Sequence, residues 1–185
     1  MATSFGPSAL ATPANGVTVA RLLAAPFLIV MIDGSEGSWA AFILWFVLCV
    51  TDGIDGFLAR RHGTTRSGAF LDPLADKVLV LGAMFALVKW DVFWWLPVAL
   101  IAVREIAISM YRSAAGRQGI TIPARQGAKV KTLCQQFAVG FAILPWTADD
   151  RWLFNGFLWI AVFLTLLTGA QYLFDARRVA RSQLA

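Results

Sequence analysis

Residues 52–76 read DGIDGFLARRHGTTRSGAFLDPLAD, and this stretch places four carboxylates within apolar surroundings. They are Asp52, Asp55, Asp72 and Asp76, and the apolar runs on either side are each long enough to span a bilayer. One Asp at the centre of a membrane costs about 2.5–3.5 kcal/mol to insert, so four unpaired ones would cost roughly 10–14 kcal/mol. That cost is comparable with the whole stability of many domains, so the charge must be neutralised.

The spacing of the carboxylates predicts that they converge. If both runs are helices joined by a short turn through the basic loop 60–66, they form an antiparallel hairpin. Asp52 then lies level with Asp76 and Asp55 level with Asp72, while the i,i+3 and i,i+4 spacings put each pair on one helix face. Without a His or Cys, this is an all-oxygen site suited to hard divalent cations such as Mg²⁺ or Mn²⁺. Two such ions would balance the four carboxylates.

Composition predicts an integral membrane protein with a single domain over residues 1–185. The chain is 58% hydrophobic and only 15% charged, and its mean hydropathy is +0.67. Each apolar run has about the 20 residues that a helix needs to cross a bilayer. We therefore expect an all-α fold with six transmembrane helices, near 17–32, 39–59, 69–88, 92–111, 128–147 and 152–174.

Prolines fall inside three of the predicted spans, at Pro26, Pro97 and Pro145. Asp72-Pro73 allows a second start for the third helix, with Asp72 as its N-cap and Pro73 at its first position. The first run lacks a convincing cleavage site, so we do not expect a removed signal peptide.

The distribution of charge predicts the orientation. Lys and Arg gather in three segments, 60–66, 112–131 and 177–181, whereas the alternate connections hold mainly acidic residues. By the positive-inside rule, the basic segments, both termini and the carboxylates belong on the cytoplasmic side of the cell membrane. An interfacial aromatic belt is predicted at the outer ends of the spans, formed by Trp39, Trp90, Trp94, Trp95, Trp146 and Trp152. The net charge of +5 then reflects topology and anionic headgroups, and we expect no nucleic-acid partner.

The depth of the carboxylates indicates a class of chemistry. Asp52 lies eight residues before Arg60, so the site is about two helical turns inside the cytoplasmic boundary, at the level of a lipid headgroup linkage. Divalent cations there can neutralise a diphosphate while a carboxylate takes a proton from an attacking hydroxyl, which indicates phosphoryl-type transfer on a lipid. The small residues Gly56, Ala59 and Gly68 leave space for a flat ligand, although tightly packed membrane helices use the same residues.

These residues form the pattern Asp-x-x-Asp-Gly-x-x-Ala-Arg, seven residues, Gly-x-x-x-Asp-x-x-x-Asp, which begins at Asp52. The pattern resembles the signature of the CDP-alcohol phosphotransferase family at every fixed position. The resemblance implies that family's six-span fold, a homodimer with one active site per protomer, and a short N-terminal segment along the membrane. Residues 5–15 are the candidate for that segment.

The resemblance also implies roles for the residues of the signature. Metal binding is implied for Asp52, Asp55, Asp72 and Asp76, and Asp76 would in addition be the general base. A pocket for the CDP moiety is implied for Asp55, Gly56, Ala59, Arg60 and Gly68. Arg60 could equally anchor the helix end at the membrane surface.

Three further segments resemble family members that join CDP-diacylglycerol to sn-glycerol 3-phosphate: 70–77, 104–112 and 129–132. Because glycerol 3-phosphate is a dianion, its site needs several cations. The candidates are Arg104, Arg112, Arg125, Lys129 and Lys131. Two alternatives stay open: Arg104 could form a structural ion pair with Glu105, and the remaining cations could only set topology.

The opening segment Asn15-x-x-Thr18-x-x-Arg21 is also similar to the family's, where these side chains would face the site. Helix capping and backbone bonding are the alternatives. Lys77 directly follows the last Asp of the signature and could serve in a structural ion pair. We assign no role to His62, Cys49 or Cys134.

Two alternative functions remain. The first keeps the fold and metals but changes the acceptor to phosphatidylglycerol, as in cardiolipin synthases of this family, or to inositol phosphate. The second is a small cation transporter, which would move metal without releasing CMP. The two halves of the chain show no repeat of the kind that transporter folds use.

Overall fold

The computed structural model describes residues 13–62, 68–117 and 126–182, with side chains described for 16–53, 74–111 and 129–171. In these ranges the chain forms six α-helices and no strand. The helices are α1 (Pro13–Met31), α2 (Trp39–His62), α3 (Gly68–Lys89), α4 (Trp95–Arg117), α5 (Gln126–Ile143) and α6 (Arg151–Ser182). The prediction of an all-helical fold with six helices is confirmed.

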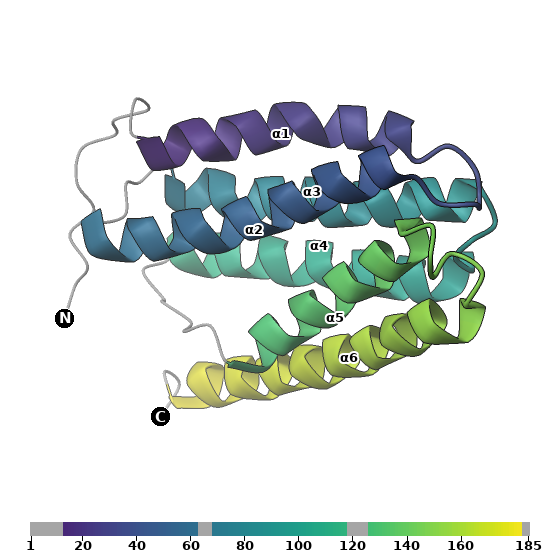
Figure 1. Ribbon diagram of the computed structural model, residues 1–185. Coiled ribbons are helices and arrows are strands. Elements are labelled where there is room, and N and C mark those ends of the chain that lie inside the picture. Colours follow the sequence, from purple (N-terminus) through teal and green to yellow (C-terminus); the bar gives the residue numbers. More distant parts are fainter. Residues whose placement is uncertain (1–12, 63–67, 118–125, 183–185) are drawn as a thin grey trace.

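The helices run up and down along a common direction, so α1 begins and α6 ends at the same end of the bundle (Figure 1). The most extensive contacts are those of α1 with α3 and of α5 with α6. Both helices of the signature, α2 and α3, pack against α1 and α5. The signature therefore lies within a four-helix arrangement, in which α1 and α5 connect the two helices of the predicted hairpin.

Several boundaries differ from those predicted, and three of these differences lie at a proline or a turn. The helix α3 begins at Gly68, so the alternative start with Asp72 as N-cap is wrong, and Pro73 lies inside the helix at the loss of one backbone hydrogen bond. The helix α5 ends at Ile143 because the residue before a proline disfavours helical geometry; placing Pro145 inside a span was therefore wrong. The helix α4 begins only at Trp95, after a turn in which Asp91 has a φ of 55°.

The predicted interfacial segment at residues 5–15 is only partly covered. Residues 13–15 belong to α1 without a break, and residues 5–12 lie outside the described residues.

The outer surface of the bundle is rich in large apolar side chains. Phe27, Val30, Val103 and Phe163, which come from three different helices, are each about two-thirds exposed or more. A soluble protein rarely shows so much apolar surface, whereas a bilayer would cover it. Among the described residues, one segment is long and apolar enough to cross a membrane, Arg151–Gln171 in α6, while Gly16–Met31 and Trp39–Gly53 are apolar but shorter.

Charged residues also lie inside the other helices. Asp76 and Lys77 lie in α3, Arg104 and Glu105 in α4, and Lys131 in α5. Each charge lowers the mean hydropathy of its helix. Several of them belong to the polar clusters described below.

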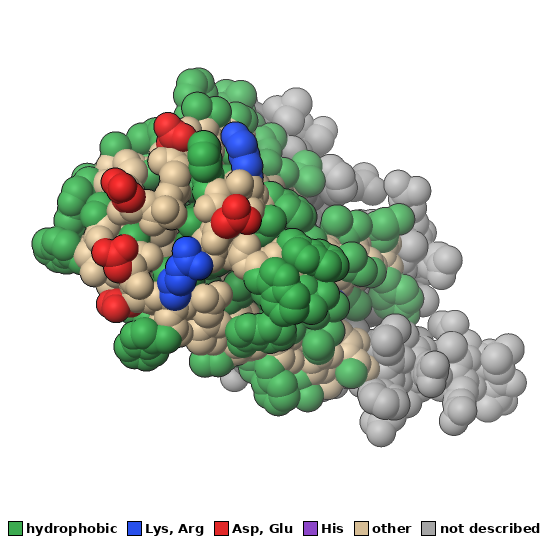
Figure 2. Space-filling model, turned by 90° about the vertical axis from the view of Figure 1, so that its right-hand side faces the viewer, with side chains coloured by type: hydrophobic (Ala, Val, Ile, Leu, Met, Phe, Trp, Pro, Cys, Tyr) green, Lys and Arg blue, Asp and Glu red, His purple; other side chains and the backbone are tan. Residues whose placement is uncertain are grey.

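Charged side chains gather at the end of the bundle that carries the short loops (Figure 2). Its exposed acidic residues outnumber its exposed basic ones, and they are Asp33, Glu36, Asp91, Asp149 and Asp150 against Lys89 and Arg151. The six tryptophans predicted for the interfacial belt are all exposed, and Trp39 and Trp146 meet edge to face with ring centroids 4.9 Å apart.

Gly37 joins the loop after α1 to the end of α5. Its φ of 74° is one that side-chain-bearing residues rarely adopt. The next residue, Ser38, donates its backbone N–H to the carbonyl of Ile143 at 2.9 Å. A Cβ on Gly37 would lie 2.8 Å from that same oxygen, so only glycine fits without displacement.

Candidate functional site

A first polar cluster, which we call the acidic cluster, consists of Asp52 on α2, Asp76 on α3 and Arg21 on α1. Arg21 donates from Nη1 to Oδ1 of Asp52 at 2.5 Å. The side chain of Arg21 is 1% exposed, whereas that of Asp52 is 34% exposed. The buried guanidinium of Arg21 is therefore paired with the carboxylate of Asp52, which is still partly exposed.

The two carboxylates of the acidic cluster lie within electrostatic range of one another. Of the neighbouring charged groups, Asp52 has the largest electrostatic effect on the carboxyl group of Asp76, and Arg21 has the next largest. The charges of both Asp residues also reach Cys49, one turn before Asp52 on α2. Two carboxylates at such range in a partly buried place repel one another, so a positive charge beside them, such as that of Arg21, is stabilising.

The other two carboxylates of the signature are placed only by their backbones. Asp55 lies one turn after Asp52 in α2, and Asp72 lies one turn before Asp76 in α3. Their side chains lie outside the described residues, and among the side chains that are described no group of three His, Cys, Asp or Glu comes together. The four-carboxylate metal site therefore stays a prediction.

The residues predicted to line the CDP pocket lie on the same two helices. Gly56, Ala59 and Arg60 occupy the last turns of α2, and Gly68 is the first residue of α3. Nothing beyond this backbone placement is described for them, so their contacts with a nucleotide also stay a prediction.

A second polar cluster, which we call the basic cluster, joins α4, α5 and α6. The carboxylate of Glu105 accepts hydrogen bonds from Arg104 at 3.0 Å and from Lys131 on α5. Arg104 also donates from Nη2 to Oγ1 of Thr168 on α6 at 2.8 Å. The structure thus brings together two of the five predicted acceptor cations, and it also contains the ion pair of Arg104 and Glu105 that was the alternative.

The helices that form the basic cluster retain buried polar atoms that no described residue satisfies. They are Nε of Arg104 within the cluster, Nε2 of Gln135 one turn after Lys131 on α5, and Oγ1 of Thr165 one turn before Thr168 on α6. Buried polar atoms nearly always have a partner, which can be a ligand or an ordered water. An ion pair alone therefore does not account for all the polar atoms of this cluster.

The remaining predicted acceptor cations are not brought to this cluster by described contacts. Lys129 is exposed, while Lys131, two residues further along α5, is buried, because such a spacing puts them on different faces of a helix. The side chains of Arg112 and Arg125 lie outside the described residues.

The candidates near the opening segment lie against the acidic cluster. Thr18 is 2% exposed and stands one turn before Arg21 on the buried face of α1, whereas the side chain of Asn15 lies outside the described residues. Lys77 donates to Oγ of Ser109 on α4. This contact is with a hydroxyl, so the ion pair considered for Lys77 stays a prediction.

Sequence reasoning missed the contribution of α6. Thr168 bonds Arg104, and a Cβ on Gly169 would lie 3.4 Å from Cγ and Nε of Arg104, so the glycine lets the guanidinium stem approach the helix. The available signal was Thr165-x-x-Thr168-Gly169 in an otherwise apolar run, because small and hydroxyl residues mark close helix contacts in membranes.

The two clusters are adjacent, because the charge of Lys131 also acts on Asp76. An acidic and a basic cluster side by side can attract cations and an anionic ligand to neighbouring positions. A sequence model of the CDP-alcohol phosphatidyltransferase family matches residues 11–167, and the chain belongs to this family of membrane-bound, generally divalent-metal-dependent enzymes.

Curated relatives cover most of the chain. A probable phosphatidylglycerophosphate synthase of Mycobacterium tuberculosis is 37% identical over 180 residues, which are 94% of this chain and 85% of the relative. CDP-diacylglycerol--glycerol-3-phosphate 3-phosphatidyltransferases are similar too. The protein from Rickettsia felis is 33% identical over 85% of this chain and 91% of its own length. That from Shigella flexneri is 36% identical over 87% of this chain and 92% of its own length.

Proposed function

We propose that this protein is an enzyme of phospholipid biosynthesis that transfers the phosphatidyl group of CDP-diacylglycerol to sn-glycerol 3-phosphate. The products are phosphatidylglycerol phosphate and CMP. The names of its relatives support these substrates, and similarity over nearly the full length supports the same reaction. The observation that carries the choice of acceptor is the pair of Arg104 and Lys131 beside the acidic cluster, with side chains only 11% and 5% exposed, since a dianionic acceptor requires cations.

The proposed setting is a cell membrane that all six helices cross. The acidic loops and exposed tryptophans face outward at one end, and the termini and the site face the cytoplasm at the other. The apolar surface between these ends supports this arrangement. In keeping with the family resemblance, the enzyme is proposed to act as a homodimer with one active site per protomer.

Asp52, Asp55, Asp72 and Asp76 would hold the metal, either Mg²⁺ or Mn²⁺, with two ions per site. The observation that supports this fit is the mutual repulsion of Asp52 and Asp76, two carboxylates that different helices bring within electrostatic range. Bound cations would supply neutralisation of the charge on the diphosphate and on the departing CMP. Carboxylate oxygens are the ligands that both ions prefer.

The chain's own residues then position the acceptor and move a proton. Arg104 and Lys131 bind the phosphate of glycerol 3-phosphate, and Asp76 takes the proton from its hydroxyl. The hydroxyl oxygen forms a bond to the β-phosphorus of CDP-diacylglycerol, and the bond from that phosphorus to the oxygen bridging toward CMP breaks. No covalent enzyme intermediate is needed, because the acceptor attacks directly.

The test is CMP release by the purified, detergent-solubilised protein with CDP-diacylglycerol and Mg²⁺ or Mn²⁺. Glycerol 3-phosphate, phosphatidylglycerol, inositol phosphate and serine are offered in parallel. Release with glycerol 3-phosphate alone is expected. Release only with another acceptor would overturn the role of the basic cluster, and metal flux into proteoliposomes without CMP release would favour the transporter.

A further inference from the structure

The helix α6 contacts the basic cluster through two adjacent residues, Thr168 and Gly169. Oγ1 of Thr168 accepts a hydrogen bond from Nη2 of Arg104 at 2.8 Å. A Cβ on Gly169 would lie 3.4 Å from Cγ and Nε of the same side chain, so the stem of Arg104 lies close to the backbone of α6. Both residues of α6 are buried. This helix therefore takes part in placing a cation that is proposed to bind the acceptor.

The hydroxyl of Thr168 is held in a fixed direction. A threonine hydroxyl has one proton to donate and two lone pairs that accept. The proton is used within α6, where Oγ1 donates to the backbone carbonyl of Leu164 at 2.7 Å, with that of Thr165 at 3.1 Å. The oxygen is thus left to accept from Arg104. An acceptor that is itself held by the helix backbone fixes the direction of the N–H group that it receives.

The guanidinium of Arg104 is held at both of its terminal nitrogens. Nη1 donates to Oε1 of Glu105 at 3.0 Å, and Nη2 donates to Thr168. Because a guanidinium is planar, bonds at two different nitrogens set its plane and its rotation within that plane. These two bonds use two of its five N–H groups, and Nε is buried without a partner among the described residues. The remaining donors are therefore presented in a fixed direction.

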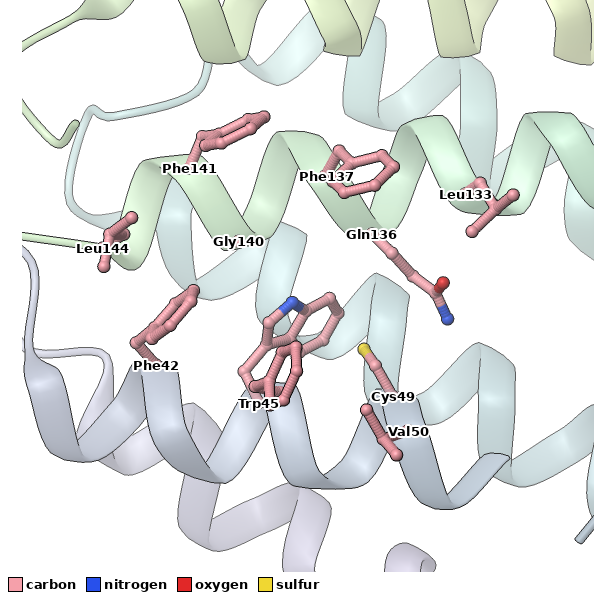
Figure 3. A pocket seen from close by; sticks show the side chains of 11 residues that line it. Phe42, Trp45, Cys49, Val50, Leu133, Gln136, Phe137, Gly140, Phe141 and Leu144 are labelled. Atoms are coloured by element: carbon pink, nitrogen blue, oxygen red, sulfur yellow. The ribbon is translucent and has the colours of Figure 1, made fainter. Parts of the chain in front are cut away.

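A groove of about 340 Å³ between α2 and α5 does not offer an anion a comparable place (Figure 3). Aromatic and aliphatic side chains make up most of its lining, to which Gln136 adds an amide. No Lys or Arg is among the described residues that line it. A phosphate is held most strongly by charged donors, and by guanidinium in particular. Its binding therefore depends on how the basic cluster presents Arg104.

We propose that Thr168 is a positioning residue for the acceptor. It orients the guanidinium of Arg104 so that the remaining N–H groups meet the phosphate of glycerol 3-phosphate. This inference rests on the proposed function, because it takes Arg104 to bind that phosphate. Gly169 belongs to the same arrangement, since it lets the stem of Arg104 lie close to α6. Thr168 acts through Arg104, so its loss weakens acceptor binding and leaves the chemical step unchanged.

The first test is Thr168→Val, which replaces the hydroxyl by a methyl group. Loss of one hydrogen bond should raise KM for glycerol 3-phosphate roughly 3–10-fold. The kcat value and KM for CDP-diacylglycerol should stay within about twofold of wild type. Thr168→Ser keeps the hydroxyl and should restore KM for glycerol 3-phosphate. An unchanged KM in Thr168→Val, or an equal change in both KM values, would overturn the positioning role.

The second test asks whether Thr168 acts through Arg104. Residues that act as a unit have non-additive effects in a double-mutant cycle. In an Arg104→Ala background, Thr168→Val should therefore change KM for glycerol 3-phosphate by less than about twofold. The same fold-change in both backgrounds would show that the effect of Thr168 is independent of Arg104, and this would overturn the inference.

A third variant reaches the same guanidinium without altering Thr168. Gly169→Leu should displace the stem of Arg104 and raise KM for glycerol 3-phosphate at least as much as Thr168→Val does. Gly156→Leu is the matched control on α6, because Gly156 is exposed and nothing lies within 4 Å of a Cβ there. Its kinetic constants should equal those of wild type. Equal effects of the two leucine variants would contradict the part assigned to Gly169.

A binding measurement separates this inference from the proposed function. Isothermal titration of the detergent-solubilised protein with glycerol 3-phosphate should give a Kd that rises in Thr168→Val and returns in Thr168→Ser. A wild-type protein that binds glycerol 3-phosphate but releases no CMP would overturn the proposed function, and the Kd values would still decide the role of Thr168. Equal Kd values in wild type and Thr168→Val would overturn that role. A wild-type protein that does not bind glycerol 3-phosphate would overturn both.

Discussion

The acidic and basic clusters are built alike and carry opposite charge. Each takes side chains from three helices, and each contains one residue of the opposite charge, Arg21 in the acidic cluster and Glu105 in the basic one. The acidic cluster has two carboxylates and one guanidinium, and so a net negative charge. The basic cluster has two cations, Arg104 and Lys131, and one carboxylate, and so a net positive charge. A single opposite charge holds each cluster together, and the excess is available for a ligand.

Because their net charges are opposite, the two clusters are suited to bind different ligands. An excess of carboxylate attracts cations, and an excess of buried cations attracts an anionic acceptor. Lys131 lies within electrostatic range of Asp76. The proposed binding site of the acceptor and the proposed base therefore lie next to each other. Variants in each cluster should therefore affect different kinetic constants, and this division can be tested.

The largest effect is expected from Asp76→Asn in the acidic cluster. The amide keeps the shape of the side chain but cannot accept the proton, so turnover should fall roughly 10²–10⁴-fold. Binding of CDP-diacylglycerol, followed by isothermal titration in detergent, should be retained. Near-normal turnover would remove Asp76 as the base.

The next effect is expected from Arg104→Ala in the basic cluster. Loss of a charge-assisted hydrogen bond should raise KM for glycerol 3-phosphate roughly 10–100-fold, with little change in KM for CDP-diacylglycerol. Arg151→Ala is the matched control, because Arg151 is exposed at the start of α6, far along that helix from Thr168. Equal changes for both substrates would assign Arg104 a purely structural role.

A smaller and more specific effect is expected from Glu105→Gln. This variant leaves Arg104 and Lys131 without the carboxylate that both contact, and breaking a buried ion pair in this way typically costs about 3–5 kcal/mol. The melting temperature should fall, and inorganic phosphate should raise it more in the variant than in wild type, because the anion replaces the lost charge. Glu36→Gln, at an exposed position, is the control. Equal stabilisation by phosphate in both proteins would contradict an anion site between these cations.

The smallest effect on function is expected from Gly37→Ala, far from both clusters. The positive φ and the close carbonyl of Ile143 should cost roughly 1–3 kcal/mol, seen as a lower melting temperature. Both KM values of the folded fraction should stay unchanged. A selective change in either KM would show that stability loss alone can imitate the effects assigned to the clusters.

The helices could be predicted because each consists of a long apolar run, and such runs need no tertiary information. The interruption of α5 before Pro145 and the start of α4 at Trp95 could not be predicted as well, because turns at the bundle end depend on local backbone geometry.

Some parts of the candidate site depend on contacts between helices that are far apart in the sequence, and these parts could not be predicted from the sequence. The approach of Asp52 and Asp76 follows from their spacing around one loop. The contact of Arg21 with Asp52 requires the position of α1, and that of Arg104 with Thr168 requires the position of α6. The groove between α2 and α5 has no sequence pattern, since its lining residues resemble any apolar helix faces.

The ion pair of Arg21 and Asp52 has a consequence for the biogenesis of the protein. A helix must enter the membrane before the completed bundle can load a metal, and at that stage its carboxylates still need a partner. The guanidinium from α1 is synthesised first and is on hand when α2 follows. We expect metal uptake to be an exchange of partners in an assembled protein, so that chelation abolishes turnover while the purified bundle stays folded and recovers when metal is returned.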